Sequence, residues 1–167
     1  MTMYYGEIAL KLKLRAKYLI FAILAAVFTV VDQMSKEWIV NVTENVEGRG
    51  FTVIKGIINF TFVKNDGASM GLFGGQRIFL ILVTVAVFAF GLWYFIKNRP
   101  DNMLFLSATS LIASGAVGNL IDRIQLGYVR DFIDLDFVNF YIFNFADCAI
   151  CMGAGLLILY AFINIKE

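Results

Sequence analysis

Four long apolar segments divide the chain, and each is long enough to cross a lipid bilayer. A bilayer core is about 30 Å thick, so a spanning helix needs about 20 mostly apolar residues. The segments are residues 16–38, 78–96, 102–121 and 145–165. The first carries Asp32 and Lys36 near its far end, whereas the second carries no charge. We therefore expect an all-α membrane protein with four transmembrane helices, built as a single membrane-embedded domain over residues 1–167.

Positive charges beside the apolar segments orient them in the membrane. Short cytoplasmic flanks of membrane proteins are enriched in lysine and arginine. The N-terminal tail carries Lys11, Lys13, Arg15 and Lys17, and the short loop after the second segment carries Lys97 and Arg99. This pattern predicts that both termini are cytoplasmic and that residues 39–77 and 122–146 lie outside.

The first outer loop has a β-rich pattern. Residues 51–54 and 57–63 are rich in aromatic and β-branched side chains and flank a turn at Lys55 and Gly56, which is typical of a hairpin. We expect a small extracytoplasmic β-rich region between the first and second helices. Because its apolar side has no soluble core to join, we expect it to rest on the membrane surface or to cover a substrate.

Composition excludes several functions. Hydrophobic residues make up 60% of the chain and charged residues 16%, against about 25% charged in soluble domains. The net charge of +1 gives no reason to expect a nucleic-acid partner. The absence of histidine removes Ser-His and Cys-His nucleophile pairs and His-ligated metal sites. We expect neither a metal nor a cofactor, and we interpret Cys148 and Cys151 as small buried side chains.

Ionisable groups at membrane depth are costly, so each requires a partner or a function. Asp32 and Lys36 are four residues apart on one helix face and predict a local ion pair. Asn119, Asp122 and Arg123 also share a face, where Arg123 could hold a carbonyl or a carboxylate.

Asp147 follows Asn144 by three residues at the start of the fourth segment, a spacing typical of a helix cap. An isolated charge among apolar neighbours would be costly, and a second carboxylate sharing one proton with Asp147 would relieve part of that cost. Two such carboxylates hydrolyse a peptide bond without histidine or metal, because one takes a proton from water while the other protonates the substrate. Composition leaves the pairing open among Asp122, Asp131, Asp134, Asp136 and Asp147.

Five motifs in order resemble those of lipoprotein signal peptidase, also called signal peptidase II, a bacterial family of membrane aspartyl peptidases. They are DQMSK at 32–36, NDGASMG at 65–71, GAVGNLIDR at 115–123, GYVRDF at 127–132 and FNFAD at 143–147. The resemblance implies that Asp131 and Asp147 form the catalytic dyad. It also implies that a set of polar residues lines the pocket (Asn65, Gly67, Asn119, Arg123 and Asn144) and that three charged residues support it (Asp32, Lys36 and Asp122).

The resemblance implies a substrate and a location. This family cuts prolipoproteins on the amino side of a cysteine that carries a diacylglyceryl group, in the bacterial cytoplasmic membrane. We accordingly expect a multi-pass peptidase in contact with membrane lipid, with its active site near the outer face, and we expect a monomer. Arg130 stands where the family usually has valine. Because neighbouring strand residues point to opposite faces, we expect Arg130 to point away from Asp131, toward water or lipid headgroups.

Two other function classes remain to be weighed. A small transporter or proton channel could use carboxylates as a relay, but such proteins hold ionisable groups near the membrane midplane. The second and third segments here carry no charge through their middles. A structural membrane protein would leave the Asn and Asp clusters as simple helix caps.

Overall fold

The structure, a computed structural model, describes residues 2–67 and 74–164, with side chains from residue 12 onward. The elements in chain order are α1 (Thr2–Val42), β1 (Gly50–Ile54), β2 (Ile58–Asn65), α2 (Arg77–Asn98), α3 (Met103–Gln125), β3 (Val129–Leu135) and α4 (Phe145–Asn164). Within these ranges, four helices are long and apolar enough to cross a membrane, as expected. The candidate spanning helix within α1 is Leu12–Val42, which contains the predicted segment 16–38. The predicted last residue of the fourth span, 165, lies outside the described residues.

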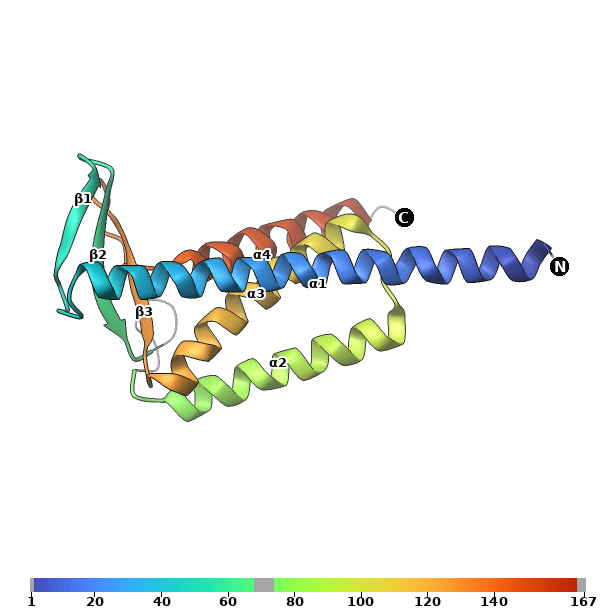
Figure 1. Cartoon of the computed structure of the whole chain (residues 1–167), viewed down its shortest axis with the longest axis horizontal. Helices are drawn as coiled ribbons and strands as arrows, with labels where there is room; N and C mark the ends of the chain where they lie inside the picture. Colours follow the sequence, from blue (N-terminus) through green and yellow to red (C-terminus); the bar gives the residue numbers. More distant parts are fainter. Residues whose placement is uncertain (1, 68–73, 165–167) are drawn as a thin grey trace.

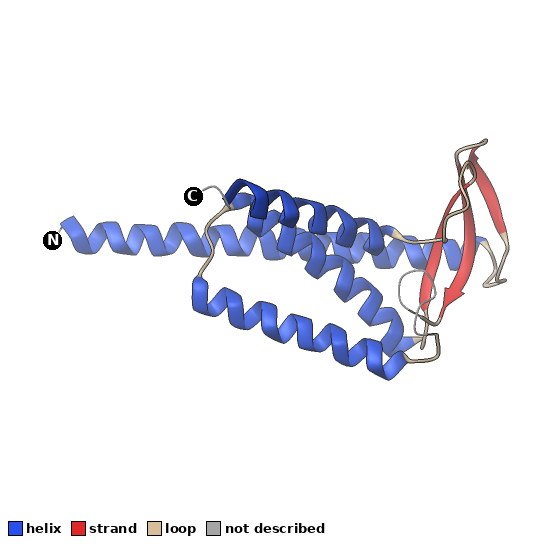
Figure 2. Cartoon of the chain, turned by 180° about the vertical axis from the view of Figure 1, so that it is seen from behind, coloured by secondary structure: helices blue, strands red, loops and turns tan. Residues whose placement is uncertain are grey.

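The helices run lengthwise and the sheet lies across one end of them (Figure 1). α3 packs against α1, α2 and α4, while α2 makes its contacts mainly with α3. α1 begins and α4 ends at the end away from the sheet, and the reverse view shows the same separation of helices and strands (Figure 2). The end of α1, the start of α4 and the end of α3 are therefore brought together beside the sheet.

Glycines let α3 and α4 approach closely, as small residues do in membrane helix pairs. A Cβ atom at Gly153 of α4 would come within 2.6 Å of the carbonyl oxygen of Ala108 on α3. A Cβ atom at Gly115 of α3 would collide with the carbonyl oxygen of Ala146 on α4. The close pairing sets the start of α4 against the polar end of α3, where Asn119 and Asp122 lie.

The sheet is antiparallel with the strand order β1-β2-β3. The predicted hairpin is confirmed as β1 and β2, and Gly56 in its turn has the positive φ of 75° that favours glycine. β3 was not expected, because the predicted β-rich region lay only between the first and second helices. The residues between α3 and α4 supply this third strand, and β2 pairs with it through Val63 and Asp131.

A small hydrophobic core joins the sheet to the end of α1. Ile39 of α1, Phe62 of β2 and Phe132 of β3 are fully buried together, and Ile133 lies beside them. The expectation that the apolar side of the hairpin has no protein core to join is therefore wrong for Phe62. Phe132 points into this core, so its neighbour Asp131 points to the other face of the strand.

Candidate active site

Asp131 and Asp147 line one cavity of about 240 Å³ at the junction of the sheet with α3 and α4. Asn65, Asn119 and Arg123 contribute polar groups to its wall. The remaining lining residues are mostly apolar: Val129, Phe140, Tyr141, Ile142, Phe143, Cys148 and Cys151. Two carboxyl groups therefore lie at a cavity whose lining is partly polar and partly apolar.

Asp131 is buried, with 2% of its surface exposed, and both of its carboxyl oxygens accept hydrogen bonds. Oδ1 accepts from Nδ2 of Asn144 at 2.6 Å, and Oδ2 accepts from Nδ2 of Asn65 at 2.8 Å. Burial, followed by the charge of Asp147, raises the pKa of Asp131 to about 7, although the two amide donors oppose the rise. Asp131 is therefore poised to hold or release a proton near neutral pH.

Asp147 is fixed by the cap at the start of α4. Its backbone N–H donates to Oδ1 of Asn144 at 3.0 Å, and its own Oδ2 accepts from the backbone N–H of Asn144 at 3.2 Å. This reciprocal pair is a capping box, with aspartate in the place where glutamate is common. Oδ1 of Asp147 accepts a further hydrogen bond from Nδ2 of Asn119 at 2.8 Å. The predicted cap is thus confirmed, and it sets the direction of the carboxyl group.

Hydrogen bonds to their carbonyl oxygens orient the amides of Asn119 and Asn144. The oxygen of Asn144 accepts from the backbone of Asp147, so its NH₂ group donates to Asp131 and, at 3.2 Å, to Oδ1 of Asn119. The oxygen of Asn119 also accepts from Nζ of Lys36 at 2.9 Å, so its NH₂ group faces Asp147. Both amides consequently donate to a carboxylate rather than competing with it.

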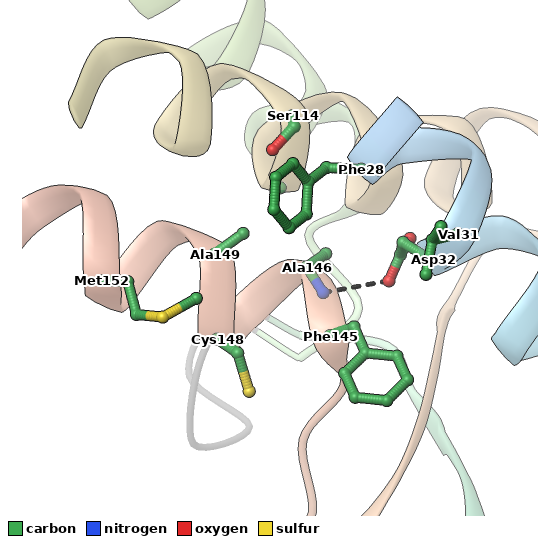
Figure 3. A pocket seen from close by; sticks show the side chains of 10 residues that line it. Phe28, Val31, Asp32, Ser114, Phe145, Ala146, Cys148, Ala149 and Met152 are labelled. Carbon is green, nitrogen blue, oxygen red and sulfur yellow. Dashed lines mark hydrogen bonds between the residues drawn. The ribbon is translucent and has the colours of Figure 1, made fainter. Parts of the chain in front are cut away.

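A buried charge cluster lies behind the amides. The ammonium of Lys36 has no exposed surface and lies 2.9 Å from Oδ2 of Asp32 and 3.6 Å from Oδ2 of Asp122. The predicted pair of Asp32 with Lys36 is confirmed, but it is a buried pair with further partners. Oδ1 of Asp32 accepts from the backbone N–H of Ala146 at 2.9 Å, which ties α1 to the first turn of α4 (Figure 3).

The sequence-based expectation that Arg130 faces water or lipid headgroups is wrong. Its side chain is buried, with 6% of the residue surface exposed. Its Nη2 donates to Oδ1 of Asp122 at 2.7 Å, and Nε and the backbone N–H donate to Oδ2 at 3.2 and 3.0 Å. Nη1 reaches Glu37 at 3.0 Å, and Nη2 also donates to Gln33 at 2.9 Å. Burial lowers the pKa of Arg130, but the bonds to Asp122 outweigh this and raise it. Strand alternation correctly predicts that Arg130 points away from Asp131, but polar groups of α1 and α3 occupy that side.

Arg123 holds the backbone that follows β2. Its Nη2 donates to the carbonyl oxygen of Gly67 at 2.9 Å, and the N–H of Gly67 donates to Oδ1 of Asn65 at 3.0 Å. Of the two partners that the sequence left open for Arg123, a carbonyl or a carboxylate, the structure shows the carbonyl of Gly67. Residues 68–71, the rest of that motif, lie outside the described residues.

The family model for signal peptidase II matches residues 24–163. The chain belongs to the signal peptidase II family. A lipoprotein signal peptidase of Lactobacillus gasseri is 40% identical over 87% of this chain and 94% of its own length. A lipoprotein signal peptidase of Lactobacillus johnsonii is 38% identical over 92% of this chain and 99% of its own length. A solved structure described as a bacterial membrane enzyme matches with a TM-score of 0.79 and 31% identity, over 91% of this chain and 92% of that one. These findings favour a peptidase over the transporter or channel considered above.

As a member of the signal peptidase II family, the chain is a membrane aspartic peptidase, and the structure brings most of its predicted site residues together. Asn65, Asn119, Arg123, Asp131 and Asp147 line one cavity. Gly67 and Asn144 touch members of that set, and Lys36, Asp32 and Asp122 lie behind it. In the described ranges, no three His, Cys, Asp or Glu side chains form a group that could hold a metal ion.

Gln33 was missed in the sequence, and the burial of the two cysteines was predicted wrongly. Nε2 of Gln33 donates to the carbonyl oxygen of Gly118 at 3.0 Å and to Asp122 at 3.2 Å, a role that a lone glutamine beside Asp32 does not reveal. The expectation of buried cysteines is wrong, because Cys151 is exposed and Cys148 is half-buried.

Proposed function

We propose that Asp131 and Asp147 are the catalytic pair with which this signal peptidase II removes signal peptides from prolipoproteins. The observation that carries the proposal is that both carboxyl groups line one cavity, with an N–H donor at each of their four oxygens. A pair of carboxylates is the catalytic device of aspartic peptidases, and a pair that shares one proton titrates as a unit.

The proposed reaction uses the pair as base and acid together. The ionised carboxylate takes a proton from a water molecule, and the water oxygen attacks the carbonyl carbon of the scissile peptide. The protonated carboxyl group donates its proton to the carbonyl oxygen, which gives a tetrahedral diol. The C–N bond then breaks as the carboxyl group that took the water proton passes it to the leaving nitrogen, and the other carboxylate recovers a proton from the diol, which becomes the product carboxyl group. The raised pKa of Asp131, about 7, leaves a substantial fraction of Asp131 protonated at neutral pH.

The polar residues around the cavity are proposed to hold the substrate backbone. Asn65, Asn119, Arg123 and Asn144 surround the two carboxyl groups, and Gly67 is fixed by Arg123 beside them. The apolar part of the lining, residues 140–143 with Cys148 and Cys151, fits a substrate that carries a diacylglyceryl group. Asp32, Lys36 and Asp122 are proposed to act through Asn119 and the start of α4 rather than on the substrate.

The proposed setting is the bacterial cytoplasmic membrane. The chain acts as one domain and as a monomer, with both termini cytoplasmic and with the sheet and the cavity near the outer face in contact with membrane lipid. Lysine and arginine beside the first two spans support this orientation. The position of the cavity at the start of α4 supports a site near one membrane face.

The dyad is tested by replacing one carboxyl group at a time. Asp131→Asn and Asp147→Asn are each expected to abolish cleavage of a lipid-modified prolipoprotein by purified enzyme, because neither pair retains both a base and an acid. Asp134→Asn is the matched control, since Asp134 lies on the same strand but contacts Thr61 at 3.4 Å and does not line the cavity. Unchanged thermal unfolding of the variants excludes misfolding. Retained cleavage by either folded variant would refute the pairing.

The lipid requirement is tested on the unmodified enzyme. We expect cleavage of the diacylglyceryl-modified substrate on the amino side of its cysteine, identified by mass spectrometry of the products. The same peptide without the lipid is expected to be cut much more slowly. Equal rates for the two substrates would contradict the proposed substrate class while leaving the dyad assignment intact.

A further inference from the structure

Two thiols lie in the wall of the dyad cavity. Cys148 and Cys151 are free cysteines one turn apart on α4, and both line the cavity that contains Asp131 and Asp147. Cys151 is four residues beyond Asp147, so the two side chains share one face of the helix. The exposed thiol of Cys151 therefore lies about one turn deeper along α4 than the carboxyl group of Asp147.

The two thiols differ in accessibility. Cys151 is exposed, whereas Cys148 is half-buried and directly follows Asp147. Cys148 also borders a second, apolar cavity of about 260 Å³ between α1, α3 and α4, where its side chain lies near Phe145 (Figure 3). Reactivity of a cysteine requires access as well as thiolate formation. Cys151 is thus the better placed of the two to meet a small molecule entering the dyad cavity.

We propose that Cys151 is a covalent modification site for small, neutral, soft electrophiles, and that an adduct there blocks the substrate from the dyad. The inference rests on the proposed function, because the cavity is taken to hold the substrate. With a maleimide, the sulfur adds to one alkene carbon and the thiol proton ends on the other. A carbon–sulfur bond forms, nothing leaves, and no oxidant is needed.

The size and the charge of the cavity favour such a reagent. A space of about 240 Å³ next to two carboxyl groups admits a small uncharged ring and leaves little room for a peptide beside it. The carboxyl groups repel an anionic reagent, so a neutral maleimide is the suitable probe. Hydrolysis by two aspartates uses no thiol, so loss of activity would come from the space that the adduct fills.

The test is inactivation of purified enzyme by N-ethylmaleimide, with the adduct located by mass spectrometry. Each variant is compared with its own untreated sample. After treatment, the cleavage rate of the wild-type enzyme is expected to fall at least tenfold, with the adduct on Cys151. Cys148→Ser is expected to lose activity in the same way. Cys151→Ser is expected to keep its untreated rate.

Occupation of the cavity gives a second measurement. A lipid-modified substrate is expected to slow the labelling of Cys151 in the inactive Asp131→Asn variant, which does not consume it. The proposal would be overturned if treated Cys151→Ser lost activity tenfold, or if wild-type enzyme carried no adduct at Cys151 or carried one without losing activity. It would also be overturned if the substrate did not slow the labelling of Cys151. An untreated wild-type enzyme that cuts no prolipoprotein would instead count against the proposed function.

Discussion

Lys36→Met removes the buried ammonium that joins α1 to Asn119 in the candidate active site. The variant keeps a long side chain but leaves Asp32, which is 2% exposed, without the cation at 2.9 Å. Removing one partner of a buried ion pair costs about 3–5 kcal/mol, because the other charge stays buried without compensation. Asp122 is affected less, since Arg130 donates to it at 2.7 Å.

The expected loss is measured by thermal unfolding in detergent, followed by near-ultraviolet circular dichroism. A chain of this size shifts by about 2–4 °C per kcal/mol, so Lys36→Met should unfold roughly 6–20 °C lower. The double variant Lys36→Met with Asp32→Asn should recover much of this loss, because it leaves no unpaired charge. Glu37→Gln is the matched control on the same helix, where 65% of the glutamate side chain is exposed and the expected change is at most about 1 kcal/mol.

Two results would refute this reasoning. If Lys36→Met unfolded at the wild-type temperature, the ammonium would not compensate the charge of Asp32. If the double variant were no more stable than Lys36→Met, the cost would come from lost packing and not from an unpaired carboxylate. The variant should also cleave more slowly, because Lys36 no longer holds the oxygen of Asn119 away from Asp147.

The remaining predictions concern helix packing and the buried arginine. Gly153→Ala should destabilise the protein by roughly 1–3 kcal/mol, because its Cβ would lie 2.6 Å from a backbone oxygen. At Gly155 on the same helix an added Cβ meets nothing within 4 Å, so Gly155→Ala should stabilise the protein by up to about 1 kcal/mol in the same unfolding assay. Equal effects of the two substitutions would contradict the close contact of α4 with α3 at Gly153. Arg130→Gln should cost about 3 kcal/mol and lower the cleavage rate, because the strand that carries Asp131 loses its bonds to Asp122. Arg130→Lys should recover part of the lost stability and part of the lost cleavage rate. Wild-type stability and cleavage in Arg130→Gln would refute the role of Arg130 in holding the strand.

The sequence predicted local features well. The four spans follow from apolar length, the pair of Asp32 with Lys36 from helical spacing, and the cap from the spacing of Asn144 and Asp147. Each depends on residues close in the chain. The proposed dyad of Asp131 with Asp147 came only from the family resemblance, because no spacing rule joins a strand to the helix that follows it.

Long-range contacts explain what the sequence did not predict. β3 is seven residues long and its burial comes from pairing with β2 and packing on Ile39, so its own pattern gave no clear signal. The direction of Arg130 followed from strand alternation, but its environment depends on Asp122 and Glu37, which come from two different helices.

The pH dependence of cleavage tests the shared proton most directly. Asp131 has a raised pKa of about 7, so its protonated form is favoured by folding. Its contribution to stability is complete below pH about 4 and is lost as the pH rises through 7. The proposed acid needs this proton, and kcat/KM on the lipid-modified substrate should therefore fall as the pH rises through about 7. A rate that keeps rising from pH 7 to about 9 would contradict a protonated carboxyl group as the acid.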